Sequence, residues 1–514
     1  MSDKNEPSLG KVYLVGAGPG DPELITLKAR RRIQEAEVLL YDALVHPEQI
    51  ALAPSDAEKI FVGKRAGQKS ARQQRINEMM LEHAQAGKRV VRLKGGDPFL
   101  FGRGSEEAEF LVERGVPFEV VPGVPSPLAA TAYTGISLTH RDHSSSVAYL
   151  TATESVEKDR TSHDWAKLAT GVETLVIFMG VRKIESLMQL LIDHGRAPET
   201  PVAVVQWASL PKQRTVIATA ATIADEVQKA GISMPALTIV GEVVRLHEKL
   251  NWFEHRALFG KRVLIPRSAE GSERLLRYLR DEGAEGIIAP TIRILPALDP
   301  APLDEAIRAA SSYDYWLFTS ANTVEIVWEK IRAEGLDLRI FGQSRVAAIG
   351  PKTREALERR GILPDLVAKE TDAEGLLSAI EAAEPHLSGK RFMLPRADLA
   401  REVLVRGLRE RGAHIDAADA YRIAPPDAEG AELIRAAISE GVDAILLSSA
   451  QTFRNLRGIA GDEALRGVPL FSIGRITSAA IREAGFEIAA ESEETTLESL
   501  VQALKKWTLV EARG

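Results

Sequence analysis

The chain has 514 residues, 45% of them hydrophobic and 27% charged, and its formal net charge is −7. At roughly 150 residues per domain this length predicts about three to four domains, and this composition excludes wholesale disorder or a single small binding module. The negative net charge argues against electrostatic binding of nucleic acid by the molecule as a whole. Cysteine is absent, which excludes disulfides, thiolate metal sites and cysteine nucleophiles.

The first residues, Met1 to Pro7, are polar, and no stretch of sequence approaches the roughly 18 apolar residues that a membrane span needs. We therefore expect a protein without a membrane partner. A cytoplasmic location is compatible with the cysteine-free composition.

Short apolar runs alternate with amphipathic stretches from Lys11 onward, which is typical of α/β layers. We expect two helices in the first half, Leu24–Glu35 and Lys183–His194. The expected strands there are Val12–Val15, Val38–Tyr41, Arg89–Leu93, Phe118–Val121, Thr174–Met179, Pro201–Gln206 and Ala236–Val240. The alternation breaks between Asn251 and Phe259, so we expect the main domain boundary there.

The second half contains an internal repeat. GKRVLIPR at Gly260–Arg267 recurs as GKRFMLPR at Gly389–Arg396, an offset of 129. Two further blocks recur at offsets of 129 and 124, namely Trp316–Ala321 with Ile445–Ala450 and Ala348–Thr353 with Ser472–Thr477. This pattern predicts two similar lobes, each with Ser/Thr-rich loops at the ends of its strands. Such loops face the ligand crevice in open parallel sheets, although duplication without a shared site is the alternative.

A first glycine loop, Gly16-Ala17-Gly18-Pro19-Gly20-Asp21, follows an expected strand. With Asp42 about twenty residues on, it invites a dinucleotide-binding interpretation, but Asp21 and Pro22 stand where that fingerprint needs its third glycine. A tight structural turn and a ligand loop therefore both remain open.

A second glycine loop strengthens the case for a ligand site. Lys94-Gly95-Gly96-Asp97-Pro98 follows the expected strand at Arg89–Leu93. Adjacent glycines let backbone approach a ligand, and the Asp97 carboxylate can accept hydrogen bonds from it. A β-turn in which Asp97 and Pro98 end the strand is the alternative.

Several motifs together resemble the tetrapyrrole methylase family and, within it, the uroporphyrinogen-III C-methyltransferases. They are GAGPGD, YDALV, VGKR, RLKGGDPFLFGRGSEE, VPGVPS, GISLTHRD, FMG and PALTIVGEVV. The resemblance covers residues 8–252 and implies a two-domain α/β fold and a homodimer formed through this half. It also implies S-adenosylmethionine as methyl donor, and two methylations of uroporphyrinogen III to give precorrin-2.

The same resemblance implies functional residues. Asp42 falls on the family's proton acceptor and Lys64 on its proton donor. A carboxylate suits this chemistry because it stabilises the positive charge that builds on the pyrrole before it accepts the proton. The implied cofactor contacts are Pro19, Gly95, Gly96, Asp97, Leu100, Pro125, Ser126, Met179, Ala208 and Ala236. Our candidates for the eight substrate carboxylates are Arg65, Arg103 and Arg141, with solvated surface arginines as the alternative.

The duplicated half, residues 260–514, resembles uroporphyrinogen-III synthase through FTSANTVE, AIGPKT, LPR, YRIAP and TLESL. The resemblance implies a bilobal fold that closes hydroxymethylbilane without a cofactor. Lobe one is expected at about 260–296 plus 425–514 and lobe two at about 298–421. Tyr421 matches the family's cleft tyrosine, whose hydroxyl can assist the leaving group, with a hinge aromatic that packs between the lobes as the alternative. The expected carboxylate-binding hydroxyls, with helix capping as the alternative, are Thr319, Ser320, Thr353, Ser448, Ser449 and Thr477.

No metal site is expected, because His140 and His143 lack a third ligand nearby. The hypothesis is a bifunctional α/β enzyme that makes uroporphyrinogen III in its second half and methylates it in its first. Its expected partners are small tetrapyrrole substrates. The alternatives are a nicotinamide-dependent oxidoreductase and a non-catalytic tetrapyrrole-binding protein. Bound NAD would favour the first, and tight binding without turnover the second.

Overall fold

The computed structural model describes residues 9–63, 73–152, 163–268, 271–398 and 402–511. The chain divides into two compact units. The first comprises Met1–Val263, Arg274–Gly286 and Val501–Gly514, and the second comprises Leu264–Glu273 and Ile287–Leu500. None of the helices in the described ranges combines the length and apolar character that a membrane crossing requires.

The first sheet is wholly parallel, with the strand order β3-β2-β4-β1-β5. Its strands are β1 (Val12–Gly16), β2 (Val38–Tyr41), β3 (Glu58–Phe61), β4 (Val90–Lys94) and β5 (Phe118–Val121). The helices that follow them are η1 (Pro22–Leu24), α1 (Leu27–Gln34), α2 (Pro47–Ile50), α3 (Gln73–Gln85), α4 (Gly104–Val112) and α5 (Ser126–Thr134).

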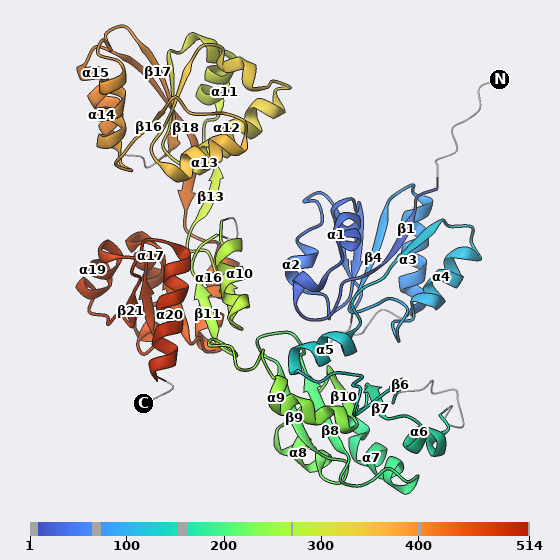
Figure 1. The fold of residues 1–514 in the computed structure, drawn as a ribbon. Coiled ribbons are helices and arrows are strands. Elements are labelled where there is room, and N and C mark those ends of the chain that lie inside the picture. The colour runs from blue at the N-terminus through green and yellow to red at the C-terminus, as the bar shows by residue number, and fades with distance from the viewer. Residues whose placement is uncertain (1–8, 64–72, 153–162, 269–270, 399–401, 512–514) are drawn as a thin grey trace, which may run out of the picture. The chain divides into compact units, whose positions relative to one another are not determined.

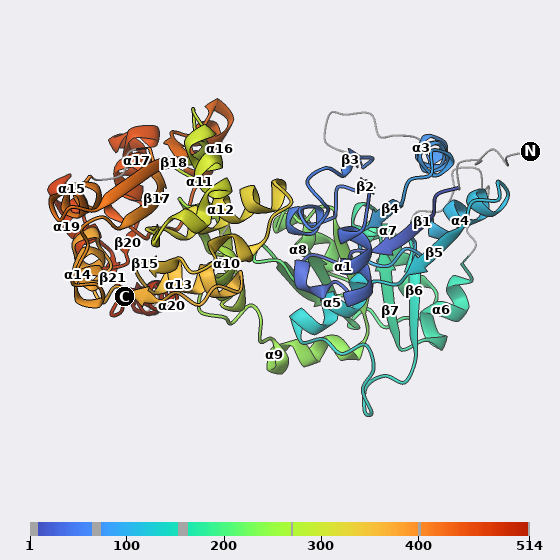
Figure 2. The same cartoon turned by 90° about the horizontal axis from the view of Figure 1, so that it is seen from above.

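Helices cover both faces of this sheet. Figures 1 and 2 both show α1 on one face and α3 with α4 on the other. The burial agrees, because Leu14 and Leu40 pack with Met80 of α3, whereas Leu39 packs with Ile33 of α1. A parallel sheet covered on both faces reads as continuous apolar strands, which is why these strands are visible in the sequence.

The second sheet is mixed, with the strand order β6-β7-β10-β8-β9. Only β6 and β7 pair in parallel, and the other neighbours are antiparallel. Its strands are β6 (Val147–Thr151), β7 (Thr174–Phe178), β8 (Pro201–Gln206), β9 (Arg214–Thr219) and β10 (Ala236–Val240). The helices are α6 (Trp165–Gly171), η2 (Val181–Lys183), α7 (Ile184–Asp193), α8 (Ile223–Lys229), η3 (Glu242–Leu246) and α9 (His247–Leu250).

The segment expected as a linker is packed against α5. The indole Nε1 of Trp252 donates to the backbone oxygen of Ala132 at 2.8 Å. Phe253 is 3% exposed and packs edge-on against Tyr133, with 4.8 Å between ring centroids. These contacts hold residues 252–253 to the first unit.

The duplicated half contains two sheets, in the orders β12-β11-β19-β20-β21 and β13-β18-β17-β14-β15-β16. The strands of the first are β11 (Arg262–Ile265), β12 (Glu285–Ile288), β19 (Ala444–Leu447), β20 (Leu470–Ser472) and β21 (Ala490–Glu491). Those of the second are β13 (Arg293–Pro296), β14 (Tyr315–Phe318), β15 (Arg345–Ala348), β16 (Leu366–Val367), β17 (Arg391–Ala397) and β18 (His414–Ala424).

Helices separate these strands along the chain. Those of the first copy are α10 (Glu273–Asp281), α16 (Ala428–Ser439), α17 (Ala450–Ala460), α18 (Asp462–Leu465), α19 (Arg475–Glu483) and α20 (Leu497–Glu511). Those of the second copy are α11 (Ala301–Arg308), η4 (Ala310–Ser312), α12 (Ala321–Ala333), η5 (Leu338–Phe341), α13 (Pro351–Arg359), α14 (Ala373–Ala383) and α15 (Val403–Glu410).

The repeat in the sequence is a repeat in the fold. Strands β14 and β19 start 129 residues apart, helices α13 and α19 start 124 apart, and the equivalent strands hold the same positions in the two sheets. The expected internal duplication is confirmed. One detail differs from the lobe limits given above: Arg293–Pro296 pairs with Tyr421–Ala424 of β18 and so joins the second of these sheets.

Candidate active site

Three loops at the carboxyl ends of β1, β4 and β5 pack backbone against backbone. Gly18 and Gly96 exchange backbone hydrogen bonds of 3.2 and 2.9 Å. A Cβ atom on Gly123 would meet the Gly96 oxygen at 2.2 Å, and one on Gly16 would meet the Gly123 nitrogen at 2.5 Å. Only glycine fits such an approach. Close packing of the backbone therefore explains part of the glycine pattern, in agreement with the tight structural turn that was the alternative to a ligand loop.

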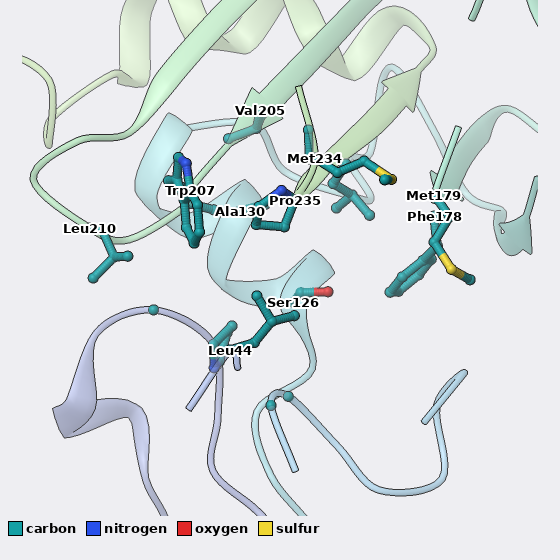
Figure 3. A pocket seen from close by; sticks show the side chains of 17 residues that line it. Leu44, Ser126, Ala130, Phe178, Met179, Val205, Trp207, Leu210, Met234 and Pro235 are labelled. Atoms are coloured by element: carbon teal, nitrogen blue, oxygen red, sulfur yellow. The ribbon is translucent and has the colours of Figure 1, made fainter. Parts of the chain in front are cut away.

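A cavity of about 390 Å³ lies beside these loops. Its lining is Pro19, Gly20, Leu44, Gly95, Gly96, Ser126, Ala130, Phe178, Met179, Val205, Trp207, Ala208, Leu210, Met234, Pro235, Ala236 and Leu237. Figure 3 shows Trp207 and Pro235 opposite Leu44 and Ser126. Both α/β domains of the first unit thus contribute walls to one cavity, and those walls are mostly apolar.

The cavity brings together most of the residues predicted to contact the cofactor. Those that line it are Pro19, Gly95, Gly96, Ser126, Met179, Ala208 and Ala236. Leu100 and Pro125 are not among its lining residues, and Pro125 is the residue that precedes the first turn of α5.

Asp97 accepts hydrogen bonds from two backbone amides. Its Oδ1 accepts from the Phe99 amide at 2.8 Å and its Oδ2 from the Gly123 amide at 3.1 Å. Because each carboxylate oxygen has a backbone partner, the side chain ties the loop after β4 to the loop after β5. These hydrogen bonds fit the turn alternative, and the predicted ligand contact of Asp97 stays a prediction.

Sequence reasoning named Met179 but missed the aromatic residues of the cavity and the strained backbone found there. Phe178 and Trp207 line it, and Met179 and Trp207 adopt left-handed backbone at φ 55° and 52°. Non-glycine residues in this region are uncommon and gather at functional sites. Phe178 is the first residue of the FMG motif, which was the available signal for it.

Asp42 follows β2 and forms an ion pair with Arg92. The Arg92 Nη2 donates to both carboxylate oxygens of Asp42, at 2.9 and 3.0 Å. The Asp42 side chain is 30% exposed, whereas that of Arg92 is 3% exposed. Arg92 comes from the neighbouring strand β4, so the pairing of β2 with β4 sets this contact. Asp42 is therefore fixed in direction while one side stays open.

Glu107 of α4 completes this buried group of charges. Its Oε1 accepts from Arg92 Nε at 3.3 Å and from Lys94 Nζ at 2.9 Å, and its side chain is 0% exposed. Burial and the nearby Arg92 lower the pKa of Lys94, against the opposing effect of Glu107. Sequence reasoning named none of these three residues.

The predicted substrate-binding arginines of this half are dispersed. Arg103 is exposed and forms an ion pair with Glu106 at 2.6 Å, which raises the pKa of its guanidinium. Arg141 is also exposed, and neither lines the cavity. Lys64 and Arg65 lie outside the described residues.

In the duplicated half, two of the predicted hydroxyls cap helices. Ser320 Oγ accepts from the Thr323 amide at the start of α12, and Ser449 Oγ accepts from the Thr452 amide at the start of α17, both at 3.1 Å. These are N-cap bonds, the alternative considered for them above. Thr319 and Ser448 precede the caps and are half-buried.

Tyr421 and Ser320 are brought together. Tyr421, in β18, is 6% exposed, and its Oη lies 3.4 Å from Ser320 Oγ. The other two predicted hydroxyls, Thr353 and Thr477, occupy equivalent places in the first turns of α13 and α19 and are 3% and 4% exposed. Among the described residues no group of three or more His, Cys, Asp or Glu side chains could hold a metal ion.

Comparison with known proteins agrees with this division. The family model of Tetrapyrrole (Corrin/Porphyrin) Methylases matches residues 11–224, and that of Uroporphyrinogen-III synthase HemD matches residues 273–502. The "Porphyrin biosynthesis protein HemD" of Ruminiclostridium josui is 34% identical over 495 residues, which are 96% of this chain and 97% of that protein. The chain belongs to both families.

Two further relatives cover the methylase half. The Uroporphyrinogen-III C-methyltransferase of Bacillus subtilis is 48% identical over 246 residues, which are 48% of this chain and 95% of that protein. A crystal structure of Uroporphyrin-III C-methyl transferase from Thermus thermophilus, complexed with S-adenyl homocysteine, shares 46% sequence identity. It covers 46% of this chain and 100% of that chain, with a TM-score of 0.40.

These findings confirm the predicted fusion, its α/β fold class and its two enzyme activities: an S-adenosylmethionine-dependent C-methyltransferase and a uroporphyrinogen-III synthase.

Proposed function

We propose that this methylase–synthase fusion carries out two consecutive reactions. Residues 260–514 close hydroxymethylbilane to uroporphyrinogen III, and residues 8–252 methylate that product twice to precorrin-2. The proposal includes a homodimer formed through the methylase half and a cytoplasmic location. The observation that carries it is the cavity of about 390 Å³, because residues from distant motifs, from Pro19 to Ala236, line it together.

The cavity suits S-adenosylmethionine. Its volume is within the usual range for small-molecule sites, and such sites are mostly apolar. Gly95 and Gly96 leave backbone open toward the cavity, while Phe178, Met179 and Trp207 supply apolar surface. When bound, the cofactor supplies a methyl group on a positively charged sulfonium.

Asp42 is proposed as the group that accepts the proton lost from the methylated pyrrole carbon. Its ion pair with Arg92 keeps the carboxylate in one orientation, and a positioned carboxylate stabilises developing positive charge before it accepts the proton. Lys64 keeps its expected role as proton donor, and Arg65, Arg103 and Arg141 remain candidates for binding substrate carboxylates.

Tyr421 is proposed to assist departure of the hydroxyl from the linear substrate. Its buried Oη lies 3.4 Å from Ser320 Oγ, so a hydrogen bond can orient it. The strand-end hydroxyls and helix amides of both lobes are proposed to bind substrate carboxylates.

The test is an anaerobic incubation of the chain with hydroxymethylbilane and S-adenosylmethionine, followed by mass and isomer analysis. A type III product with two added methyl groups is expected. Unmethylated type III product would overturn the methylase assignment, and only the spontaneous type I ring would overturn the synthase assignment.

Two matched variants separate the halves in this assay. Tyr421→Phe is expected to lose type III ring closure yet methylate supplied uroporphyrinogen III. Asp42→Asn is expected to show the reverse pattern. If Asp42→Asn methylated at the wild-type rate, the role of Asp42 would be wrong while the function stood.

A further inference from the structure

The duplication places an arginine at the same strand end in each copy. Pro266-Arg267 ends the block that contains β11, and Pro395-Arg396 ends the equivalent block in β17, 129 residues later. The two arginines can therefore be compared within one chain. They differ in the number of carboxylates that lie beside them.

Arg396 is neutralised by its own copy of the fold. Its Nη1 donates to Glu402 Oε1 at 2.7 Å and its Nε to Asp419 Oδ1 at 3.2 Å. Burial alone would lower the pKa of Arg396, but these two carboxylates outweigh it and raise the pKa. Its charge is already satisfied.

Arg267 has no such neutralisation. It is half-buried, and within the described part of the chain no carboxylate pairs with its guanidinium. Burial lowers the pKa of Arg267, and no neighbouring acid offsets this. An arginine nevertheless stays protonated at neutral pH. A desolvated cation without a partner is unfavourable, so this position favours an anion from outside the fold.

The guanidinium lies at the ligand-facing end of its strand. A Cβ atom on Gly271 would meet Arg267 Nη2 at 4.0 Å, which places the charged group beside the turn between β11 and α10. Ser448 and Ser449 follow β19, the strand next to β11 in the sheet. Ligands bind outside the carboxyl ends of strands in open α/β sheets.

A second difference between the copies also adds positive charge to the strand ends of the β11 copy. Arg475 opens α19 and is exposed, whereas Pro351 occupies the equivalent place at the start of α13. The strand ends of the β11 copy thus carry two arginines that differ from their counterparts: Arg267 is half-buried and unpaired among the described residues where Arg396 is paired, and Arg475 is exposed where the β17 copy has Pro351. A substrate with eight carboxylates needs cations or amides to hold it.

We propose that Arg267 binds a carboxylate of the linear tetrapyrrole substrate during ring closure. This inference rests on the proposed synthase function and assigns the β11 copy, rather than the β17 copy, as the one that holds substrate by charge. Arg267 is proposed as a binding residue, so its loss should weaken substrate binding, and thus raise KM, more than it lowers kcat.

The test measures KM and kcat for type III ring closure in the full chain with Arg267→Met, which keeps an apolar stem and removes the charge. We expect KM for hydroxymethylbilane to rise about tenfold, in line with one charge-assisted hydrogen bond. Arg267→Lys is expected to recover part of the loss, because it restores charge but not the planar donor fork. Methylation of supplied uroporphyrinogen III by the same samples reports whether the rest of the chain is folded and active.

Arg396→Met is the matched control. It removes the equivalent arginine of the other copy, and its KM is expected to stay within about twofold of wild type. An unchanged KM in Arg267→Met, or an equal rise in Arg396→Met, would overturn the assignment of Arg267. A wild-type chain that forms no type III isomer would instead overturn the proposed function on which the assignment rests.

Discussion

The methylase half and the duplicated half support their strand-end loops in different ways. In the methylase half three loops pack backbone against backbone through Gly16, Gly96 and Gly123, with buried charged residues behind them. In the duplicated half the equivalent loops end in Ser320 and Ser449, which cap the next helix. The first arrangement leaves no room for a side chain, and the second depends on hydrogen bonds between a serine and the threonine three residues later.

The difference teaches which substitutions each half tolerates. A cavity lined mainly by backbone and apolar surface tolerates side-chain changes that remove no hydrogen bond. It does not accept added volume where the loops meet. The capped loops accept added volume more readily but lose stability with the hydroxyl.

The largest effect is expected from Gly123→Ala. Its Cβ would meet the Gly96 oxygen at 2.2 Å, so the loops must separate, and displacements of about 1 Å at a site can reduce activity 100-fold. We expect methylation and S-adenosylmethionine affinity to fall by about 100-fold or more while ring closure persists. Gly171→Ala is the control, because nothing lies within 4 Å of its added Cβ. Wild-type cofactor affinity in Gly123→Ala would contradict this account of the loops.

Glu107→Ala tests the buried charges behind those loops. Removing this fully buried carboxylate leaves Arg92 and Lys94 without their shared partner. Loss of one partner from a buried ion pair destabilises by about 3–5 kcal/mol. Denaturant unfolding of the full chain should show the methylase transition at a much lower midpoint. Glu109→Ala, exposed on the same helix, should change it by about 0.5 kcal/mol or less, and equal effects would refute the importance of burial here.

Ser449 separates capping from ligand binding in the other half. Ser449→Ala should lower the unfolding free energy by about 1 kcal/mol, whereas Ser449→Asp should keep the cap because aspartate is an equally good N-cap residue. The aspartate also places a negative charge at the strand end, which repels a polycarboxylate substrate. We therefore expect Ser449→Asp to keep its stability and to raise KM for ring closure several-fold. Wild-type KM in that variant would mean that Ser449 serves the fold alone.

The smallest effect concerns a cluster of ion pairs on the first sheet. Hydrogen bonds from Lys28, Lys11 and Arg32 lower the pKa of Glu119 to about 2, against an opposing effect of burial. A lowered pKa stabilises the fold above the usual glutamate pKa of about 4.3, and this contribution is lost as pH falls toward about 2.

Glu119→Gln should therefore lower stability above about pH 5 by about 1 kcal/mol or less, since surface ion pairs contribute little. The difference from wild type should disappear by about pH 2. Glu113→Gln is the control, because that exposed carboxylate pairs only with Arg114 among the described residues. Unfolding curves measured from pH 2 to 7 decide the matter, and a difference independent of pH would contradict the assignment.

Much of the fold could be predicted from sequence because the central strands are buried on both faces. Strands β2, β8 and β10, which lie inside their sheets, have the limits expected for them, and so does the edge strand β5. The strands that sequence reasoning missed include β3, β6 and β9, which lie at sheet edges. Edge strands such as β9 are partly exposed along their whole length, so their residues show a weaker apolar pattern.

The sequence by itself determined the repeat, the two families and seven of the residues that line the cavity, because these depend on motifs that stay in order along the chain. The tertiary structure decided what no spacing contains. It paired Asp42 with Arg92, 50 residues away, and turned Asp97 toward backbone amides. It also gave Arg396 two carboxylates, whereas Arg267 has none among the described residues. Such partners come from different strands and helices, so they are set by how sheets and loops pack and not by local sequence.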